Sequence, residues 1–137
     1  MTLLSRLGVS ALLCSLWACT YAGASTSEAG GGERELALAV GESAALGECR
    51  IGLVRLVADS RCPEGMTCVW AGDAEVELEL SCSGNSHELR LHTNLEPREA
   101  EIEGWHVELL AVDPAPRADT AQDASAVRVR LMVAPVE

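Results

Sequence analysis

The stretch AEVELELSC, residues 74–82, alternates apolar and polar side chains without interruption. Successive side chains of a β-strand point to opposite faces of its sheet, so this alternation predicts a strand with one buried and one solvated face. The inward face is predicted to comprise Ala74, Val76, Leu78, Leu80 and Cys82. The period of two, rather than 3.6, indicates a β-sheet protein.

The same two-residue period continues on both sides of this strand, from Arg34 to the last residues. Leu56 falls out of phase with its neighbours, which predicts a β-bulge near Val54 and Arg55. No helix is predicted in this part of the chain. The pattern predicts an all-β domain of about seven short strands, a small β-sandwich that is either immunoglobulin-like or barrel-like. The expected strands cover residues 36–40, 43–46, 49–56, 74–82, 89–91, 105–109 and 127–133.

Composition limits the core and the partners. The chain has 137 residues, no Phe and a net charge of −11, and all of its basic residues are Arg. We expect one small domain whose core consists of Val, Leu, Ile and Ala with Trp70 and Trp105. The acidity argues against nucleic-acid binding and against docking on anionic lipid, because both require basic side chains.

The N-terminus is expected to direct export. Residues 1–18 carry one Arg and then an apolar run too short to span a bilayer, which is typical of a signal peptide. The run ends in LWAC, which resembles a bacterial lipobox and predicts lipidation of Cys19. The alternative is cleavage after Ala24, which would give a secreted protein. Residues 19–33, rich in Gly, Ala and Ser, are expected to form a flexible tether before a domain at 34–137.

Both processing routes leave four cysteines, and the stretch RCPEGMTCVWAG at residues 61–72 contains two of them. Zinc sites usually place paired cysteines closer together, and redox pairs usually have two residues between them. We therefore expect a structural disulfide between Cys62 and Cys68 and no metal site. Cys49 and Cys82 are expected to form a second disulfide, bridging the two sheets, although four cysteines allow three connectivities.

Three residues of this region are candidates for recognition. Asp59 and Arg61 flank the cysteine loop, and Trp70 follows it. Asp59 and Arg61 could form an ion pair that shapes the loop, and Trp70 could pack on the disulfide or on the core. Alternatively, all three belong to a recognition surface, since loops on a rigid scaffold often carry function. Gly72 is expected to let the chain turn into the strand that starts at Ala74.

The stretch DSRCPEGMTCVWAGDAEVELEL, residues 59–80, resembles the signature of an uncharacterised family of small exported bacterial proteins and lipoproteins. The signature is D-S-R-C-P, a few residues, C-x-W-x-G and then an alternating strand. The resemblance implies export and brings no catalytic residues. Cys49 and Cys82 are additions to the cysteine pair common in the family.

No nucleophile or phosphate-loop motif occurs in the chain, and His87 and His92, five positions apart on one expected strand, should face opposite sides. We therefore expect a lipid-anchored protein of the bacterial cell envelope, facing the periplasm or the exterior. Its function is expected to be non-catalytic binding of an envelope protein or ligand, with no cofactor. The alternatives are a secreted domain with a structural or stress-related role and, least favoured, a hydrolase.

Overall fold

The computed structural model describes residues 32–137, so the expected signal peptide, Cys19 and nearly all of the expected tether lie outside the described residues. The described part contains eight strands and one short 3₁₀ helix, η1. Their bounds are β1 (Arg34–Ala39), β2 (Ser43–Leu46), β3 (Cys49–Asp59), β4 (Ala74–Cys82), β5 (Asn85–His92), β6 (Glu99–Ile102), β7 (Trp105–Asp113), η1 (Ala124–Ala126) and β8 (Arg128–Pro135).

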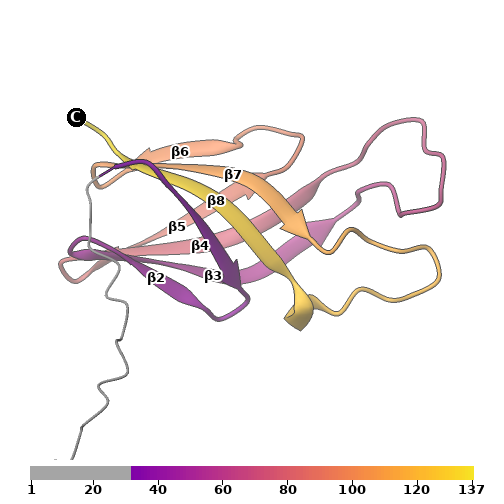
Figure 1. Ribbon diagram of the computed structural model, residues 1–137, viewed down its shortest axis with the longest axis horizontal. Helices are drawn as coiled ribbons and strands as arrows, with labels where there is room; N and C mark the ends of the chain where they lie inside the picture. The colour runs from indigo at the N-terminus through magenta and orange to yellow at the C-terminus, as the bar shows by residue number, and fades with distance from the viewer. Residues whose placement is uncertain (1–31) are drawn as a thin grey trace, which may run out of the picture.

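The strands form two four-stranded antiparallel sheets, with the orders β1-β8-β7-β6 and β2-β3-β4-β5 (Figure 1). Within each sheet consecutive strands are neighbours, and β8 returns to pair with β1 over six residue pairs, from Arg34 opposite Val133 to Ala39 opposite Arg128. The chain changes sheet only between β1 and β2 and between β5 and β6. This all-β sandwich is therefore an up-and-down meander, which matches the barrel-like alternative. The immunoglobulin fold instead has Greek-key connections.

The core lies between the two sheets and is almost entirely aliphatic. The predicted inward face of β4 is buried from Ala74 to Cys82, and alternate residues of β3, β5, β7 and β8 meet it. Trp105 packs partly buried against this core, as expected. Trp70 does not: its side chain is 55% exposed, so the expectation that it would contribute to the core is wrong. The aliphatic sheets close over each other without it.

One prediction about the strands, the bulge in β3, is confirmed, and one strand, β6, was not predicted. The predicted bulge is confirmed, because the β3–β4 register shifts between Leu53 and Arg55. The strand β6, however, was not among the expected strands. Its sequence EAEI has only two apolar residues, and both are half-buried, so the alternation is too short to stand out from the polar connection before it.

The two ends of the sandwich are built differently (Figure 1). One end, the short-turn end, has two-residue turns between β2 and β3, β4 and β5, and β6 and β7. Two of these turns, Ser83-Gly84 and Glu103-Gly104, have positive φ at both residues, which suits tight hairpins. The opposite end, the long-loop end, carries the connections 60–73, 93–98 and 114–127. The strand β1 begins at the short-turn end, and β8 finishes there.

Candidate functional site

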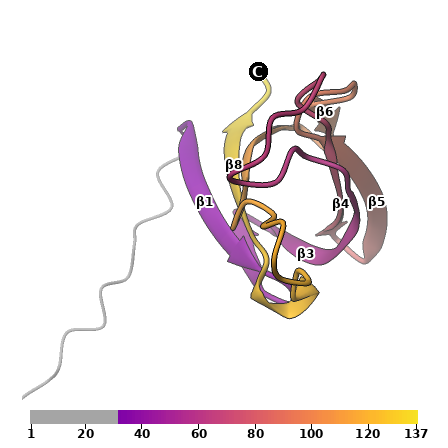
Figure 2. The same ribbon diagram turned by 90° about the vertical axis from the view of Figure 1, so that its right-hand side faces the viewer.

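The long-loop end brings two distant segments of the chain side by side (Figure 2). The Glu64 amide donates a hydrogen bond to the Pro116 carbonyl at 2.9 Å, and Arg117 lies 3.7 Å from the Glu64 carboxylate. The cysteine loop between β3 and β4 therefore rests on the Pro-rich loop between β7 and β8. The sequence placed these loops in the same domain but did not indicate this contact.

Asp59 and Arg61 position the cysteine loop. The Arg61 guanidinium donates to both carboxylate oxygens of Asp59, at 2.9 and 2.6 Å, and also to the carbonyls of Val112 and Pro114. The Arg61 side chain is only 14% exposed and the Asp59 side chain only 5%. Burial tends to raise the pKa of Asp59, but the hydrogen bonds and charge of Arg61 outweigh it and lower that pKa. The two residues thus shape the loop, as the first interpretation expected, and contribute little to its surface.

Two disulfides form, one at each end of the sandwich. Cys62 pairs with Cys68 inside the long loop, and Cys49 pairs with Cys82 beside the short turns. These are the expected partners. The second disulfide does not bridge the sheets, however: Cys49 and Cys82 are directly opposite on the neighbouring strands β3 and β4. The expectation of a sheet-to-sheet bridge is therefore wrong, because inward-facing cysteines on adjacent strands meet within one sheet.

Asp73 joins the cysteine loop to the loop after β5. Its buried carboxylate accepts hydrogen bonds from the amides of Asn94 and Leu95 at 2.8 and 3.2 Å, and from the Thr93 hydroxyl. His92 Nδ1 lies 2.7 Å from the same carboxylate. Burial tends to raise the pKa of Asp73, but these hydrogen bonds lower it overall. This cluster was not found from the sequence, because it depends on the spatial meeting of β4 and β5.

Only glycine fits at position 72, because the backbone of Ser60 and Arg61 lies very close to it. Its φ is +73°, and a Cβ at this position would lie 1.9 Å from the Ser60 carbonyl oxygen. No side chain fits there. The expected role of Gly72 in turning the chain into β4 is thus confirmed, and the reason is contact between the two arms of the loop.

Most of the large apolar side chains exposed in residues 32–137 lie at the long-loop end. Six large apolar side chains are exposed in the described residues, and four of them, Met66, Val69, Trp70 and Leu95, lie at this end. The Val69 side chain is fully exposed, at 105%. Trp70 packs neither on the core nor in a closed pocket, so of the three recognition candidates it alone presents its side chain to solvent. Exposed apolar side chains gathered at one end of a protein are candidates for an interaction site.

A shallow hollow of about 180 Å³ lies in the neighbouring loop between β7 and β8. Its lining combines Pro and Ala residues with four polar ones, Arg117, Thr120, Gln122 and Asp123. The hollow and three of these side chains, Met66, Val69 and Trp70, belong to the two loops that Glu64 and Pro116 join, and Leu95 belongs to the loop after β5. The long-loop end thus offers both a projecting and a concave apolar feature.

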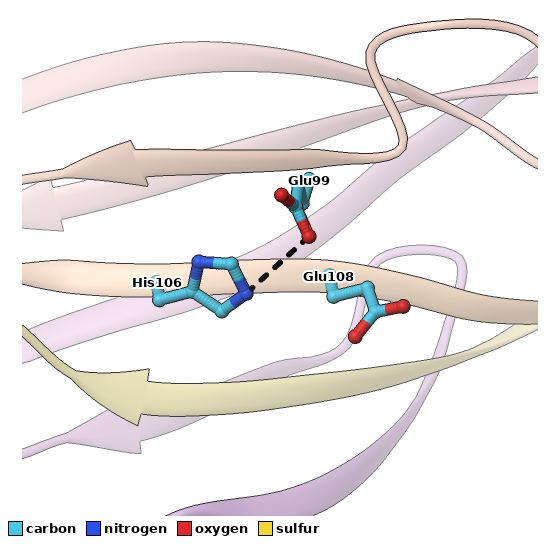
Figure 3. A group of neighbouring side chains, drawn as sticks. All are labelled: Glu99, His106 and Glu108. Carbon is cyan, nitrogen blue, oxygen red and sulfur yellow. Dashed lines mark ion pairs between the residues drawn. The ribbon is translucent and has the colours of Figure 1, made fainter.

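The three histidines lie at separate places, each beside a carboxylate. His87 contacts Glu103 at the short-turn end, and His92 contacts Asp73 at the long-loop end. As expected, the strand pairing puts His87 and His92 on opposite faces, opposite Leu80 and Glu75 respectively. His106 lies on the outer face of the other sheet, next to Glu99 and Glu108 (Figure 3).

All four cysteines of the described residues are disulfide-bonded, so no thiolate joins any histidine. The group of Glu99, His106 and Glu108 was missed from the sequence, although His106 and Glu108 alternate on one strand. Their carboxylate partner Glu99 lies on β6, which the sequence did not reveal as a strand.

The chain matches no family model, no curated protein and no solved structure. Within residues 32–137, no helix has the length and apolar character needed to cross a bilayer.

Proposed function

We propose that the chain is an exported, lipid-anchored protein of the bacterial cell envelope whose long-loop end binds a partner protein. The observation that carries this proposal is the exposure of Val69, Trp70 and Met66 on a loop that is closed by a disulfide and held by Arg61. Exposing these side chains to water is unfavourable in the free protein, and a partner that covers them would gain their burial energy. A loop already fixed in one shape loses little entropy on binding.

Export is supported by the two disulfides, which form and persist in oxidising compartments. Anchoring is supported by the lipobox-like LWAC before Cys19 and by the direction of the domain. The strand β1 starts at the short-turn end, so a tether from an upstream anchor would attach at the end opposite the long loops and would leave these loops accessible. Binding rather than catalysis is supported by the dispersed histidines, because an acid–base site gathers such groups in one pocket.

Site-specific photo-crosslinking in the producing cell tests this proposal. A photoreactive residue replaces Val69 in the full chain, and matched controls replace Val54 on the outer face of β3 and Ser83 at the short-turn end. We expect a discrete protein adduct from position 69 only, and we expect Trp70→Ala to abolish it while both disulfides remain intact. Adducts of equal yield from all three positions, or none from position 69, would overturn the proposal.

A further inference from the structure

Both sheets carry several carboxylates on their outer faces, but only on one sheet are most of these carboxylates paired with arginines. On the sheet β2-β3-β4-β5, Arg90 contacts Glu75, Glu77 and Glu88, and Arg55 contacts Glu77 at 2.6 Å. Even the like-charged pair on this face, Glu79 opposite Glu88, has Arg90 on one of its members. Three of the four glutamates named on this face, Glu75, Glu77 and Glu88, are therefore paired with arginines of the protein itself.

The face of the other sheet has a like-charged pair without such compensation. Glu99 on β6 lies directly opposite Glu108 on β7. Among the described residues, no arginine forms an ion pair with either glutamate; Arg130 on β8 contacts Glu35 and Asp113 instead. Like charges directly opposite on paired strands destabilise a sheet. A cation bound between the two carboxylates would relieve this repulsion.

His106 completes the group. It alternates with Glu108 on β7, so both side chains point to the same face, and its Nε2 lies 3.7 Å from a carboxylate oxygen of Glu99 (Figure 3). One donor atom from each of Glu99, His106 and Glu108 lies within 4.8 Å of the other two. Donor atoms around a tetrahedral zinc ion are about 3.4 Å apart, given metal–ligand distances near 2.1 Å. The three donors would therefore have to move closer by side-chain rotation when a metal ion binds.

We propose that Glu99, His106 and Glu108 form a binding site for a divalent transition-metal ion, with Zn²⁺ as the best fit. Imidazole favours Zn²⁺ over Mg²⁺ and Ca²⁺, which prefer oxygen ligands alone, and two carboxylates neutralise the charge of the ion. Glu101 lies 3.9 Å from Nδ1 of His106 on the other side of the ring. This distance is too long for a hydrogen bond. If the Glu101 side chain rotated to accept from Nδ1–H, it would favour the tautomer that leaves Nε2 free to bind the metal.

Three protein ligands leave one tetrahedral position open to water or to a donor group from another molecule. The site lies on the outer face of β6 and β7, away from the cysteine loop, so it does not depend on the proposed binding at the long-loop end. Because the site is on a solvated surface and its ligands are neither buried nor held by hydrogen bonds, we expect it to be weaker than a structural zinc site.

Isothermal titration of the full, untagged chain with Zn²⁺ alone tests the proposal. We expect one site that His106→Ala and Glu108→Gln each weaken by about tenfold or more. The matched controls are His87→Ala and Glu88→Gln, which remove an imidazole and a carboxylate from surface pairs elsewhere, and both should retain the wild-type isotherm. Cysteines upstream of residue 32 are common to all variants, so any binding by them cancels.

Thermal unfolding gives a second readout that a simple His106–Glu99 ion pair would not produce. Without metal, Glu108→Gln should raise the Tm, because it removes the charge repulsion with Glu99. With Zn²⁺ at a concentration near the wild-type Kd, the wild-type Tm should rise, and that of Glu108→Gln should rise much less because this variant binds more weakly. Two results would overturn the proposal: equal isotherms for the wild type and His106→Ala, or a wild-type Tm that does not change when Zn²⁺ is added. Either would mean that His106 and Glu99 form an ion pair and bind no metal.

Discussion

The short-turn end and the long-loop end of the sandwich are held in shape by different kinds of contact. At the short-turn end, residues adjacent in sequence define each turn, as Ser83 and Gly84 do between β4 and β5. At the long-loop end, the shape depends on contacts between segments far apart, such as Arg61 with Val112 and Asp73 with Asn94. The comparison shows that buried polar contacts can hold an irregular loop where turn chemistry alone cannot.

The largest expected difference between the ends concerns their disulfides. Cys49–Cys82 spans 33 positions and Cys62–Cys68 only 6. Because a disulfide restricts the unfolded chain more when it closes a longer loop, Cys49→Ala with Cys82→Ala should lower the free energy of unfolding by about 4 kcal/mol, and Cys62→Ser with Cys68→Ser by about 2 kcal/mol. Urea unfolding measures both. The reverse order would mean that the long loop, not the sheet, dominates stability.

A glycine at each end gives the next comparison. Gly72→Ala should lower the free energy of unfolding by about 3 kcal/mol or more, because a Cβ would collide with the Ser60 carbonyl as well as strain the positive φ. Gly84→Ala, whose added Cβ has no neighbour within 4 Å, should cost only the strain, about 1–2 kcal/mol. Urea unfolding of the two variants under identical conditions is the measurement. Equal costs would contradict the close contact between the arms of the cysteine loop.

The smallest effect depends on pH. Hydrogen bonds keep the folded-state pKa of Asp73 below its ordinary value, so the folded protein takes up this proton less readily than the unfolded chain. The stabilisation is complete above about pH 4 and is lost as the pH falls through the folded-state pKa. Asp73→Asn should cost about 2 kcal/mol at pH 6, by leaving its donors poorly paired, and should flatten the loss of stability below pH 4.

The control for this prediction is Glu48→Gln in a short turn, whose side chain makes no hydrogen bond within residues 32–137. This variant should keep the wild-type profile of unfolding free energy against pH. If Asp73→Asn kept that profile as well, the hydrogen bonds around Asp73 would not be the source of the acid sensitivity.

Most strands of the sandwich could be predicted from the sequence. Each of these strands buries one face, and burial of one face produces the two-residue alternation of apolar and polar side chains. The sequence also indicated the correct cysteine partners, but not that Cys49 and Cys82 share a sheet, since alternation gives the face of a residue and not the neighbour of its strand. The Asp59–Arg61 pair was expected from the sequence, but the bonds from Arg61 to Val112 and Pro114 and the partners of Asp73 could not be found. These partners lie up to 53 positions away in the chain.

One missed strand accounts for the missed metal-ligand group. The sequence placed His106 and Glu108 on a strand, but Glu99 was assigned to a polar connection. Without β6 there was no register to set Glu99 opposite Glu108. Short edge strands with few apolar residues give little periodic signal in the sequence. Contacts between side chains that depend on the pairing of such a strand therefore cannot be predicted from the sequence.

The pairing of β1 with β8 has a mechanical consequence. The chain enters the domain at the short-turn end, and the proposed partner would attach at the other end. Tension between an anchor and a bound partner would therefore run along the strands. Hydrogen bonds between antiparallel strands lie perpendicular to that direction, so all six residue pairs of the β1–β8 ladder would bear the load in shear together rather than separate one after another.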